Sequence, residues 1–466
     1  MSILMAAHKA WNSGADMRAR RNRYKQYTYG NQWGDLIADD HGNIVTEGEY
    51  ASASGKKPLS NNLIRRLVKC IVGRFRTEHI NTLGGDAMRK VSQMNHLDEL
   101  DSRMLEEFLI SGCAIQRVVE EHRPGMGMGV WIDNVSPSRF FVNATSDPRG
   151  WDVEMVGMLH DMSLTEVMMR YSHGSREKAR ELRRLYADDA ELHSATQALG
   201  LSVNDSLDFF RAGESRCRVI EVWTLESREV LRCHDALTGE YYCTGIDREP
   251  ELIATNAMRR EQGEDEVAMR WEIATRWHCR FLSPSGDVLD EMDSPYRHGL
   301  HPFAVKLYPL TDGEVHSFVE DVIDQQRYVN RLITLIDHIM GASAKGVLMF
   351  PDNQRSETMT WEQIGRLWSS CNGVIPYRPK NGEPGPQQIS SNCTNIGAYE
   401  LLNLEMKLFE DISGVSQAFQ GREAASGTAA SLYNAQAANS AISLADIFAT
   451  FNDFRRCRNR LVEGTR

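Results

Sequence analysis

Apolar residues in the last third of the chain recur every three or four positions, which is the spacing of amphipathic helices. One stripe runs from Val315 to Met340, and a second runs from Ala398 to Ser413, where Gly414 follows. From Thr428 to Leu461 the pattern is again helical, with alanine on several faces. We therefore predict two amphipathic helices and one long helix of roughly 50 Å, which requires close neighbours on more than one side.

A compact insert separates the first two of these helices. Between Lys345 and Cys393 the pattern predicts a strand at 346–350, a short helix at 361–369 and a second strand at 373–377. A turn rich in proline and glycine follows the second strand. Nothing in this order of elements is typical of a catalytic site, so we interpret the last third of the chain as a structural scaffold.

The first two thirds of the chain mix helical and strand patterns. Residues 1–30 form a basic amphipathic pattern, and helical spacing returns at 63–72 and 97–111. Residues 35–58 and the acidic stretch 258–266 are polar and are predicted to be loops. Short apolar runs bounded by turn residues predict strands at 114–120, 129–134, 139–143, 153–160, 218–224, 229–234, 270–281, 288–291 and 302–310. The predicted fold class is α+β.

The charge of the chain bears on one class of function. The sequence has 53 Lys and Arg residues against 64 Asp and Glu residues, a formal net charge of −11. A protein that wraps nucleic acid carries a strong basic excess, so tight binding of DNA or RNA over the whole surface is not expected. An acidic chain is still able to touch DNA locally or to guide it by repulsion.

The nine cysteines do not form a metal-binding pattern. None belongs to a CxxC pair, and Cys233-His234 and His278-Cys279 lack the further ligands of a tetrahedral site. We interpret the cysteines as reduced thiols in a cytoplasm. No apolar run approaches the ~20 residues that span a bilayer, and the first residues lack the apolar core of a signal peptide. We therefore expect no membrane partner, no metal and no cofactor.

Eight short motifs follow one another in a recognisable order that covers nearly the whole chain. They are Gly30-Asn31-Gln32-Trp33, Asn61-Asn62-Leu63-Ile64, Val135-Ser136-Pro137, Asp147-Pro148-Arg149-Gly150, His301-Pro302-Phe303, Gly346-Val347-Leu348, Ile412-Ser413-Gly414-Val415 and Ser426-Gly427-Thr428-Ala429. In this order the chain resembles the portal proteins of tailed bacteriophages, which are the head-to-tail connectors.

The resemblance implies a ring of about twelve subunits with double-stranded DNA passing through its centre. It implies a portal-like subunit with a mixed α/β wing, a two-helix stem, a small α/β clip and a long C-terminal helix with a short or absent crown. By analogy these parts are the wing at 1–314, stem helices at 315–344 and 394–416, the clip at 345–393, a tunnel loop at 417–428 and the long helix at 429–466.

The implied function is a structural channel at one capsid vertex of the virion, through which DNA is packaged and ejected. The implied partners are the large subunit of the terminase motor, head–tail adaptor or tail proteins, the major capsid protein and scaffolding proteins. Assembly in the bacterial host cytoplasm is expected. Contact with DNA is expected to be weak and independent of base sequence, because each neutralised phosphate adds affinity that would hinder sliding.

The segment between the second stem helix and the long helix carries the expected contact with DNA. Glycine permits the unusual backbone conformations that a projecting loop needs. The DNA-channel candidates are Gln420, Gly421, Arg422, Ser426 and Gly427. The segment lacks the GxxxxGK[ST] spacing of a phosphate-binding loop. An ordinary connection between two helices is the alternative interpretation.

The insert combines scattered basic residues with two tryptophans. The candidates for docking the motor or the adaptor are Lys345, Arg355, Trp361, Arg366, Trp368, Arg378 and Lys380. Trp361 and Trp368 are seven residues apart and share one helix face, which favours a role as core or subunit-interface anchors. The basic residues either meet DNA or an acidic partner, or they are ordinary solvated charges.

The long helix carries the expected contacts between subunits. Ala438, Ala441 and Ala445 are small enough to allow the close approach of a neighbouring chain. The arginines at 455, 456, 458 and 460 lie near the end of the helix, where its dipole favours positive charge. Contact between these arginines and packaged DNA is the alternative.

No catalytic motif is visible in the sequence. It has no GxSxG sequence and no order of Ser, His and Asp that is typical of a hydrolase. Adjacent acids such as Glu106 and Glu107 point about 100° apart on a helix, so they do not converge for acid–base chemistry. We therefore expect no enzyme. The alternative is a cytoplasmic nucleic-acid-processing enzyme with an unrecognised active site. Such an enzyme is more often a monomer to tetramer, whereas a ring elutes at many times 52.8 kDa.

Overall fold

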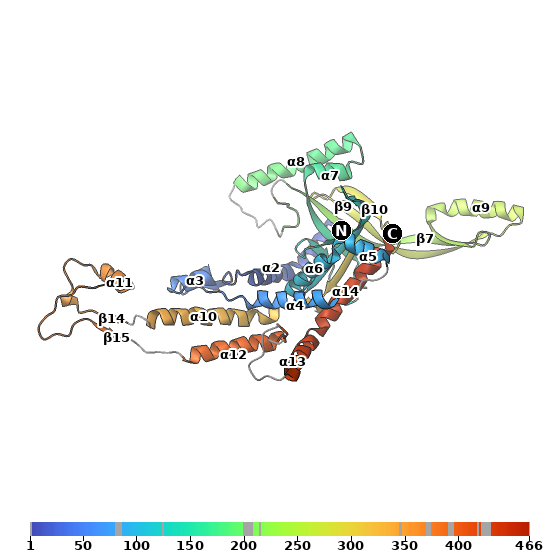
Figure 1. Cartoon of the computed structure of the whole chain (residues 1–466). Coiled ribbons are helices and arrows are strands. Elements are labelled where there is room, and N and C mark those ends of the chain that lie inside the picture. The colour runs from blue at the N-terminus through green and yellow to red at the C-terminus, as the bar shows by residue number, and fades with distance from the viewer. Residues whose placement is uncertain are drawn as a thin grey trace. The chain divides into compact units, whose positions relative to one another are not determined.

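The computed structural model describes residues 2–79, 86–123, 125–198, 208–213, 216–343, 347–369, 374–389, 396–416, 419–420 and 430–465. Helices and antiparallel sheets are both abundant, which confirms the α+β class (Figure 1). The chain divides into two compact units. Unit 1 comprises Met1–Asn22, Val72–Ser317 and Asp446–Arg466, and unit 2 comprises Arg23–Ile71 and Phe318–Ala445. Each unit therefore joins segments that are far apart in the sequence.

A six-stranded sheet forms the centre of unit 1. Its order is β10-β9-β7-β6-β5, with β8 beside β7, and every neighbouring pair is antiparallel. The strands are β5 (Phe140–Val142), β6 (Met155–Met162), β7 (Cys217–Asp235), β8 (Glu240–Gly245), β9 (Val267–Leu282) and β10 (Val288–Asp293).

Helices cover both faces of this sheet beside β6 and β7. Ile220 of β7 points to one face, where it packs with Trp11 of α1 (Ile3–Ser13). Val219 points to the opposite face and packs with α7 (Leu164–Tyr171) and α8 (Arg176–Ala198). Successive side chains of a strand point to opposite faces, so burial on both faces explains the nearly continuous apolar run in this part of β7.

A second, three-stranded antiparallel sheet packs against the first. Its order is β11-β3-β4, with β3 at Cys113–Arg123, β4 at Gly127–Asn134 and β11 at Phe303–Leu307. Ile115 and Phe303 of this sheet share a core with Trp223 and Trp277 of the larger sheet. The core that joins the two sheets is therefore built from both β7 and β9.

Helices complete unit 1 beside the smaller sheet. Asn95 fastens α5 (Asp86–Asn95) to β4, because its amide donates to the Val130 carbonyl at 3.0 Å and accepts from the Ile132 N–H at 2.9 Å. Phe451 of α14 (Ala445–Gly464) is fully buried beside Phe108 of α6 (Leu97–Ser111), with the ring centroids 5.8 Å apart. Two short strands, β12 (Pro309–Thr311) and β13 (Glu314–Val315), follow β11.

The far halves of β7 and β9 extend beyond the rest of unit 1 as a ribbon, which we call the arm (residues 225–277; Figure 1). The arm end, residues 236–266, contains β8, a 3-10 turn at Ile246–Arg248 and α9 (Glu249–Gln262). Leu252 of α9 packs onto Leu231 and Cys233 of the ribbon. The side chain of Asn256 exchanges two hydrogen bonds with the backbone of Val267, so α9 is fastened to the ribbon.

Unit 2 is built around two neighbouring helices, α10 (Ile323–Ser343) and α12 (Ile396–Ser413). Between them in sequence lie β14 (Val347–Met349), α11 (Trp361–Ser369) and β15 (Gln387–Ile389). The other elements are β1 (Leu36–Ala38), β2 (Ile44–Thr46), α3 (Glu47–Ala53), α13 (Ala430–Ser443) and 3-10 turns at Glu320–Val322 and Asp352–Gln354. Two helices, α2 (Ala15–Tyr29) and α4 (Leu63–His79), contribute residues to both units.

Two amide side chains of α10 hold the segment that precedes α4. The side-chain oxygen of Gln326 accepts hydrogen bonds from the N–H groups of Leu63 at 2.8 Å and Ile64 at 3.2 Å. Asn330 accepts from the N–H of Asn61 at 3.0 Å. The first N–H groups of a helix have no partner within the helix. A residue more than 260 positions away therefore caps α4.

Three predicted helices have different limits from those expected. The predicted helix 1–30 is two helices, α1 and α2, divided at Gly14. The stem helix predicted at 315–344 begins only at Ile323, because Val315 pairs with Pro309 in a strand. The long helix predicted at 429–466 is two helices, α13 and α14, separated at Leu444, so the prediction of one continuous helix is wrong.

Two predicted loops contain regular structure. Residues 35–58 hold β1, β2 and α3, and α3 begins with a capping box between Thr46 and Glu49. The stretch 258–266 includes the last turns of α9, which ends at Gly263 with φ at +72°. A glycine in this left-handed conformation is a common helix stop, so a local signal for the end of α9 was present.

Two strand predictions also need correction. The strands predicted at 218–224 and 229–234 are one strand, because residues 225–228 of β7 remain paired with β9. In the insert, β14 pairs with β15 at 387–389 and not with the predicted strand at 373–377. Tyr377 makes only an isolated bridge with Arg355, and residue 373 lies outside the described residues.

Candidate functional site

The insert between α10 and α12 is a small α/β element whose described residues include two exposed aromatic side chains, Trp361 and Tyr377. Ile364 is the buried side of α11, at 4% exposure. Trp361 contacts Phe350 edge-on, with the ring centroids 5.9 Å apart, yet 45% of its surface is exposed. Trp368, seven residues and about two helical turns further on, is partly buried. Trp361 is therefore anchored on one side and open to a partner on the other.

Three of the basic residues predicted for docking bind groups within the insert. Arg355 donates to the Met359 carbonyl at 3.0 Å. Arg378 pairs with Glu357 at 2.7 Å, and Lys380 pairs with Glu383 at 3.5 Å. Such exposed pairs add little stability, but they reduce the positive charge that the insert presents.

Two basic candidates of the insert remain, Arg366 and Lys345. Arg366 lies on α11, and Lys345 lies outside the described residues.

The segment that precedes the predicted tunnel loop is fastened to the last turns of α13. The backbone N–H of Ser416 donates to the hydroxyl oxygen of Ser440 on α13 at 2.9 Å, and the two hydroxyls lie 2.8 Å apart. Gly414 has φ at +65°, and an added Cβ would lie 2.7 Å from the Cβ of Ser443. The chain that leaves α12 therefore packs directly against the last turns of α13.

Gln420 is the one DNA-channel candidate that falls within the described residues. Its amide donates to the Val415 carbonyl at 3.3 Å. It lines a small pocket with residues of α4 and α12, among them Leu67 and Phe409. The other four candidates, Gly421, Arg422, Ser426 and Gly427, lie outside the described residues.

The three alanines predicted for subunit contact are all exposed in the single subunit. Ala438 and Ala441 lie on α13, and Ala445 is the first residue of α14. Ser440 and Leu444, between them in sequence, are 3% and 1% exposed. This part of the chain therefore has a buried side and an exposed side of small residues.

Two of the four arginines near the end of α14 are neither exposed to solvent nor free to meet DNA. Arg455 and Arg458 are 7% and 0% exposed, and both bind Asp101 of α6. Burial lowers the pKa of Arg458, while the Asp101 carboxylate opposes that shift. Both interpretations from the sequence are therefore wrong for Arg455 and Arg458, which join α14 to α6. Arg456 and Arg460 remain exposed.

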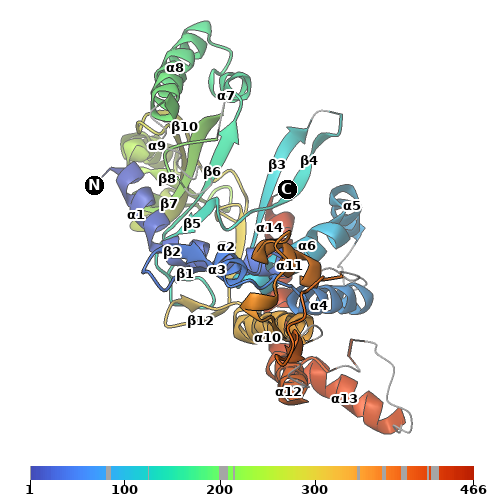
Figure 2. The ribbon, with the colours of Figure 1, turned by 90° about the vertical axis from the view of Figure 1, so that its left-hand side faces the viewer.

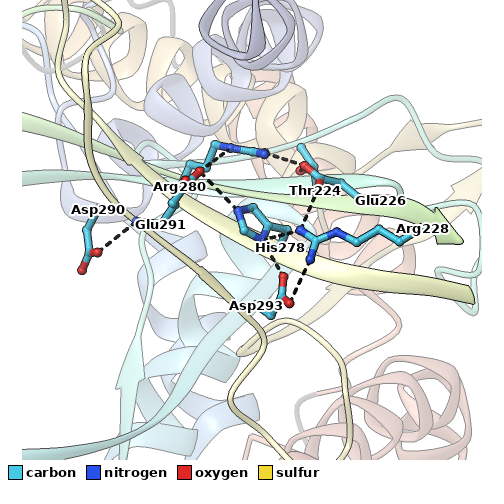
Figure 3. Close-up of polar contacts among 8 residues, drawn as sticks. All are labelled: Thr224, Glu226, Arg228, His278, Arg280, Asp290, Glu291 and Asp293. Atoms are coloured by element: carbon cyan, nitrogen blue, oxygen red, sulfur yellow. Dashed lines mark hydrogen bonds and ion pairs between the residues drawn. The ribbon is translucent and has the colours of Figure 1, made fainter. Parts of the chain in front are cut away.

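A polar cluster lies at the root of the arm, where β7, β9 and β10 meet (Figure 3). His278 Nδ1 is 2.7 Å from a carboxylate oxygen of Asp293 and 3.1 Å from the Arg228 guanidinium. Arg228 also contacts Glu226 and Asp293, at 3.3 and 3.0 Å. Arg280 bridges Glu226 and Glu291. Each acid faces a basic group, so the cluster is an ion-pair network that holds three strands together.

Comparison with known protein families decides the class of protein. The model of the phage P22-like portal protein family matches residues 5–462, nearly the whole chain. The chain belongs to that family. No curated protein matches the sequence. The chain is thus a structural portal protein of a bacteriophage, a head–tail connector that acts in DNA packaging. Ring assembly and a place in the capsid are typical of the family.

The portal subunit gives no support to the enzyme alternative. Portal proteins are structural proteins. Within the described ranges, no three His, Cys, Asp or Glu side chains are grouped so that they hold a metal ion. Burial raises the pKa of the Cys113 thiol to about 12, which makes it a poor nucleophile at neutral pH. No helix in the described part of the portal chain is long and apolar enough to cross a membrane.

Sequence reasoning missed two features of the portal subunit. Asp101 was not singled out, although a lone acid on the apolar side of a predicted helix is a signal for a buried ion pair. The acidic stretch 258–266, which includes the end of α9, was interpreted as a solvated loop. Pro250, in the first turn of α9, and Gly263 after the last turn together indicate a helix.

Proposed function

We propose that about twelve copies of this chain form a ring at one capsid vertex, and that double-stranded DNA passes through its centre during packaging and ejection. Membership of the portal family over residues 5–462 carries the proposal. The neighbouring helices α10 and α12, with the insert between them in sequence, support it.

The parts of the subunit are assigned by analogy with other portal proteins. The wing comprises 1–314, the stem comprises 315–344 and 394–416, and the clip comprises 345–393. The tunnel loop is 417–428, and 429–466 is the C-terminal helical region, with a short or absent crown. The placement of α11 and β14 within one small element supports a clip that is distinct from the stem.

Contact with DNA is proposed to be sparse. A net charge of −11 per chain makes a ring strongly acidic, which keeps its affinity for phosphate low. Copies of Arg422, one from each subunit, would supply transient contacts with phosphates around the channel. Such contacts carry no base-sequence information and are weakened by salt.

Several partners are proposed for the assembled ring. The clip, with the exposed Trp361, is the proposed docking surface for the terminase large subunit and later for a head–tail adaptor or tail protein. An aromatic side chain that is anchored on one side and exposed on the other is a frequent centre of binding energy in interfaces. The major capsid protein and scaffolding proteins would surround the ring, which is assembled in the host cytoplasm.

Mass and electron microscopy of the purified chain test the proposal. A ring elutes at about twelve times the 52.8 kDa of one chain and shows a central hole in averaged images. A protein that stays between monomer and tetramer at micromolar concentration, with no ring in the images, would show the proposal to be wrong.

A further inference from the structure

The arm end carries a large excess of acid. Residues 236–266 contain eight carboxylate side chains and three arginines. Arg259 pairs with Asp235 and Arg260 pairs with Glu266, both at 2.7 Å, so two of the arginines are neutralised within the arm. The exposed acids that remain are Glu240, Asp247, Glu249, Glu251, Glu261, Glu264 and Asp265.

Helix stability does not account for the acids at the end of α9. Glu261 lies in the last turn of α9, and Glu264 and Asp265 follow its cap at Gly263. The C-terminal end of a helix carries partial negative charge, so carboxylates are unfavourable there. Arg259 interacts with Glu264, but the arm end keeps an excess of carboxylates, which a positively charged surface outside the arm would explain.

The arm end also exposes apolar side chains beside these acids. Ile253 and Met258 of α9 are 54% and 61% exposed, whereas Leu252 packs onto the ribbon. Protein interfaces place apolar residues at their centre and charged residues at the rim. The outer side of α9 has this composition.

The arm is held firmly at its root. Arg228 and His278 bind Asp293, which joins β7, β9 and β10 where the ribbon leaves the sheet (Figure 3). An element that is ordered before it binds loses less conformational entropy on binding. The arm end is therefore presented to a partner in a defined position.

A basic surface of matching character lies on α8 of the same unit. The first twelve residues of α8 contain five basic side chains, Arg176, Lys178, Arg180, Arg183 and Arg184, against Glu177 and Glu181. All seven are exposed. Positive charge in the first turns of a helix opposes its dipole, so α8 would be more stable without Arg176 and Lys178. These charges too are explained by an outside partner.

An exposed apolar residue accompanies the basic surface. Met169 of α7 is 79% exposed, and α7 packs beside α8 (Figure 2). The α7–α8 surface, residues 164–187, therefore combines an apolar side chain with positive charge, as the arm end combines apolar side chains with negative charge.

We propose that the arm end of one subunit docks on the α7–α8 surface of the neighbouring copy in the ring. The inference rests on the ring proposed above. A closed ring is built from heterologous contacts, in which two different patches of one chain meet. Figure 1 shows α9 at the end of the arm, on a different side of unit 1 from α8, so each copy has one patch free for each neighbour.

The charges of the arm end and of the α7–α8 surface favour a second copy of the chain, and not DNA, as the binding partner. The arm end repels phosphates, and an interface between copies satisfies both patches at once.

Paired charge reversal tests the contact. Glu261→Lys with Glu264→Lys reverses the charge at two positions of the arm end. Arg176→Glu with Arg180→Glu reverses the charge at two positions of the α8 surface. Both pairs of changes agree with the helix dipoles, so each subunit keeps its fold. We expect each reversal alone to lower the ring-assembly constant by at least about tenfold, because like charges then face each other. Combining all four substitutions restores assembly.

A matched control and the possible outcomes distinguish a failure of the docking contact from a failure of ring formation. Lys56→Glu with Lys57→Glu makes the same charge change as the α8 reversal, but in unit 2, whereas both docking surfaces belong to unit 1; this variant should assemble like wild type. If wild type forms no ring, the proposed function fails. If wild type forms rings and either reversal alone assembles normally, the docking contact is wrong. The docking contact is also wrong if the variant with all four substitutions does not recover ring assembly. It is wrong too if the α8 reversal lowers DNA retention but leaves ring assembly unchanged.

Discussion

Arg458 of α14 donates a hydrogen bond to Asp101 of α6, and these side chains are 0% and 4% exposed. Arg455 donates to the other carboxylate oxygen of Asp101 at 3.0 Å. One buried acid therefore faces two buried guanidinium groups. A pair of this kind contributes modestly while it is complete, but the loss of one member leaves a buried charge without compensation.

Asp101→Asn should therefore be strongly destabilising. We expect a loss of about 3–5 kcal/mol in the free energy of unfolding, because Arg455 and Arg458 both lose their anionic partner. Urea unfolding followed by circular dichroism measures the change. Asp98→Asn, at an exposed position on the same helix, should cost less than about 1 kcal/mol. Equal effects of the two substitutions would contradict the proposed role of Asp101.

Gly112→Ala should destabilise unit 1 more than Gly263→Ala. Both glycines end a helix with nearly the same backbone, at φ of +71° and +72°. A Cβ at Gly263 meets nothing within 4 Å, so the cost is that of the left-handed conformation alone, about 1 kcal/mol. A Cβ at Gly112 would lie 2.6 Å from the carbonyl oxygen of His316, so the backbone must move. We expect a total of about 3 kcal/mol there. Thermal unfolding of the two variants in parallel measures the difference.

Acid should weaken the subunit through Glu221. Burial alone would raise the pKa of this carboxyl, but Arg117, His160 and Trp223 together lower it to about 2 from an ordinary 4.5. Between these values the native state binds fewer protons than the unfolded chain, so this contribution is complete above about pH 4.5 and is lost as the pH falls toward 2. The shift corresponds to about 3 kcal/mol.

Glu221→Gln isolates that contribution. The difference in unfolding free energy between wild type and this variant should shrink as the pH is lowered from 5 to 2.5, since wild type gradually loses the same negative charge. Trp223→Phe, which removes one hydrogen bond to Glu221, should behave in an intermediate way. A difference that stays constant over this range would show that Glu221 is not the titrating group.

Ala441→Trp should block ring assembly while leaving the subunit folded. The position is exposed in the single chain, so we expect the fold to tolerate the larger side chain, which would however collide with a closely packed neighbouring subunit. Native mass spectrometry and circular dichroism report the two properties separately. Ala438→Trp should act in the same way. Normal ring yield in both variants would remove α13 from the subunit interface.

Arg422→Glu should leave the ring intact and reduce the DNA held per particle. The substitution places negative charge around the proposed channel, where it repels phosphates most strongly at low salt. DNA retained in an assembly assay, measured beside electron microscopy of the rings, tests this expectation. Particles that fill and hold DNA like wild type would exclude Arg422 as a contact. Failure of the rings would show the segment to be structural.

Local sequence patterns were sufficient for elements that bury one face and end at a glycine. The helix at 97–111 and the stop at Gly112 were predicted correctly, as was the helix that stops at Gly414. The strands around 114–120 and 129–134 were found because their apolar residues are bounded by turn residues. In each case the signal lies within about fifteen consecutive residues.

Pairing between distant residues could not be predicted in this way. No residue near Arg458 in the sequence indicates that it pairs with Asp101, and basic residues near the end of a helix normally suggest charges exposed to solvent. The continuity of β7 through residues 225–228 depends on pairing with β9, some fifty positions later in the chain. The insert shows the same limitation, since β15 was missed because three residues give too short a pattern. Most of the predicted channel loop stays a prediction.

The order in which unit 1 is made has a consequence for the timing of assembly in the infected cell. Arg455 lies 354 positions after Asp101, so α6 waits for α14 during translation. At ~5–20 residues per second this interval is roughly 20–70 s. Throughout it, Phe108 and Asp101 lack the partners that cover them in the finished subunit. The core of unit 1 around α6 is thus completed only once α14 has been synthesised, because α14 supplies both the aromatic cover of Phe108 and the counter-charges of Asp101.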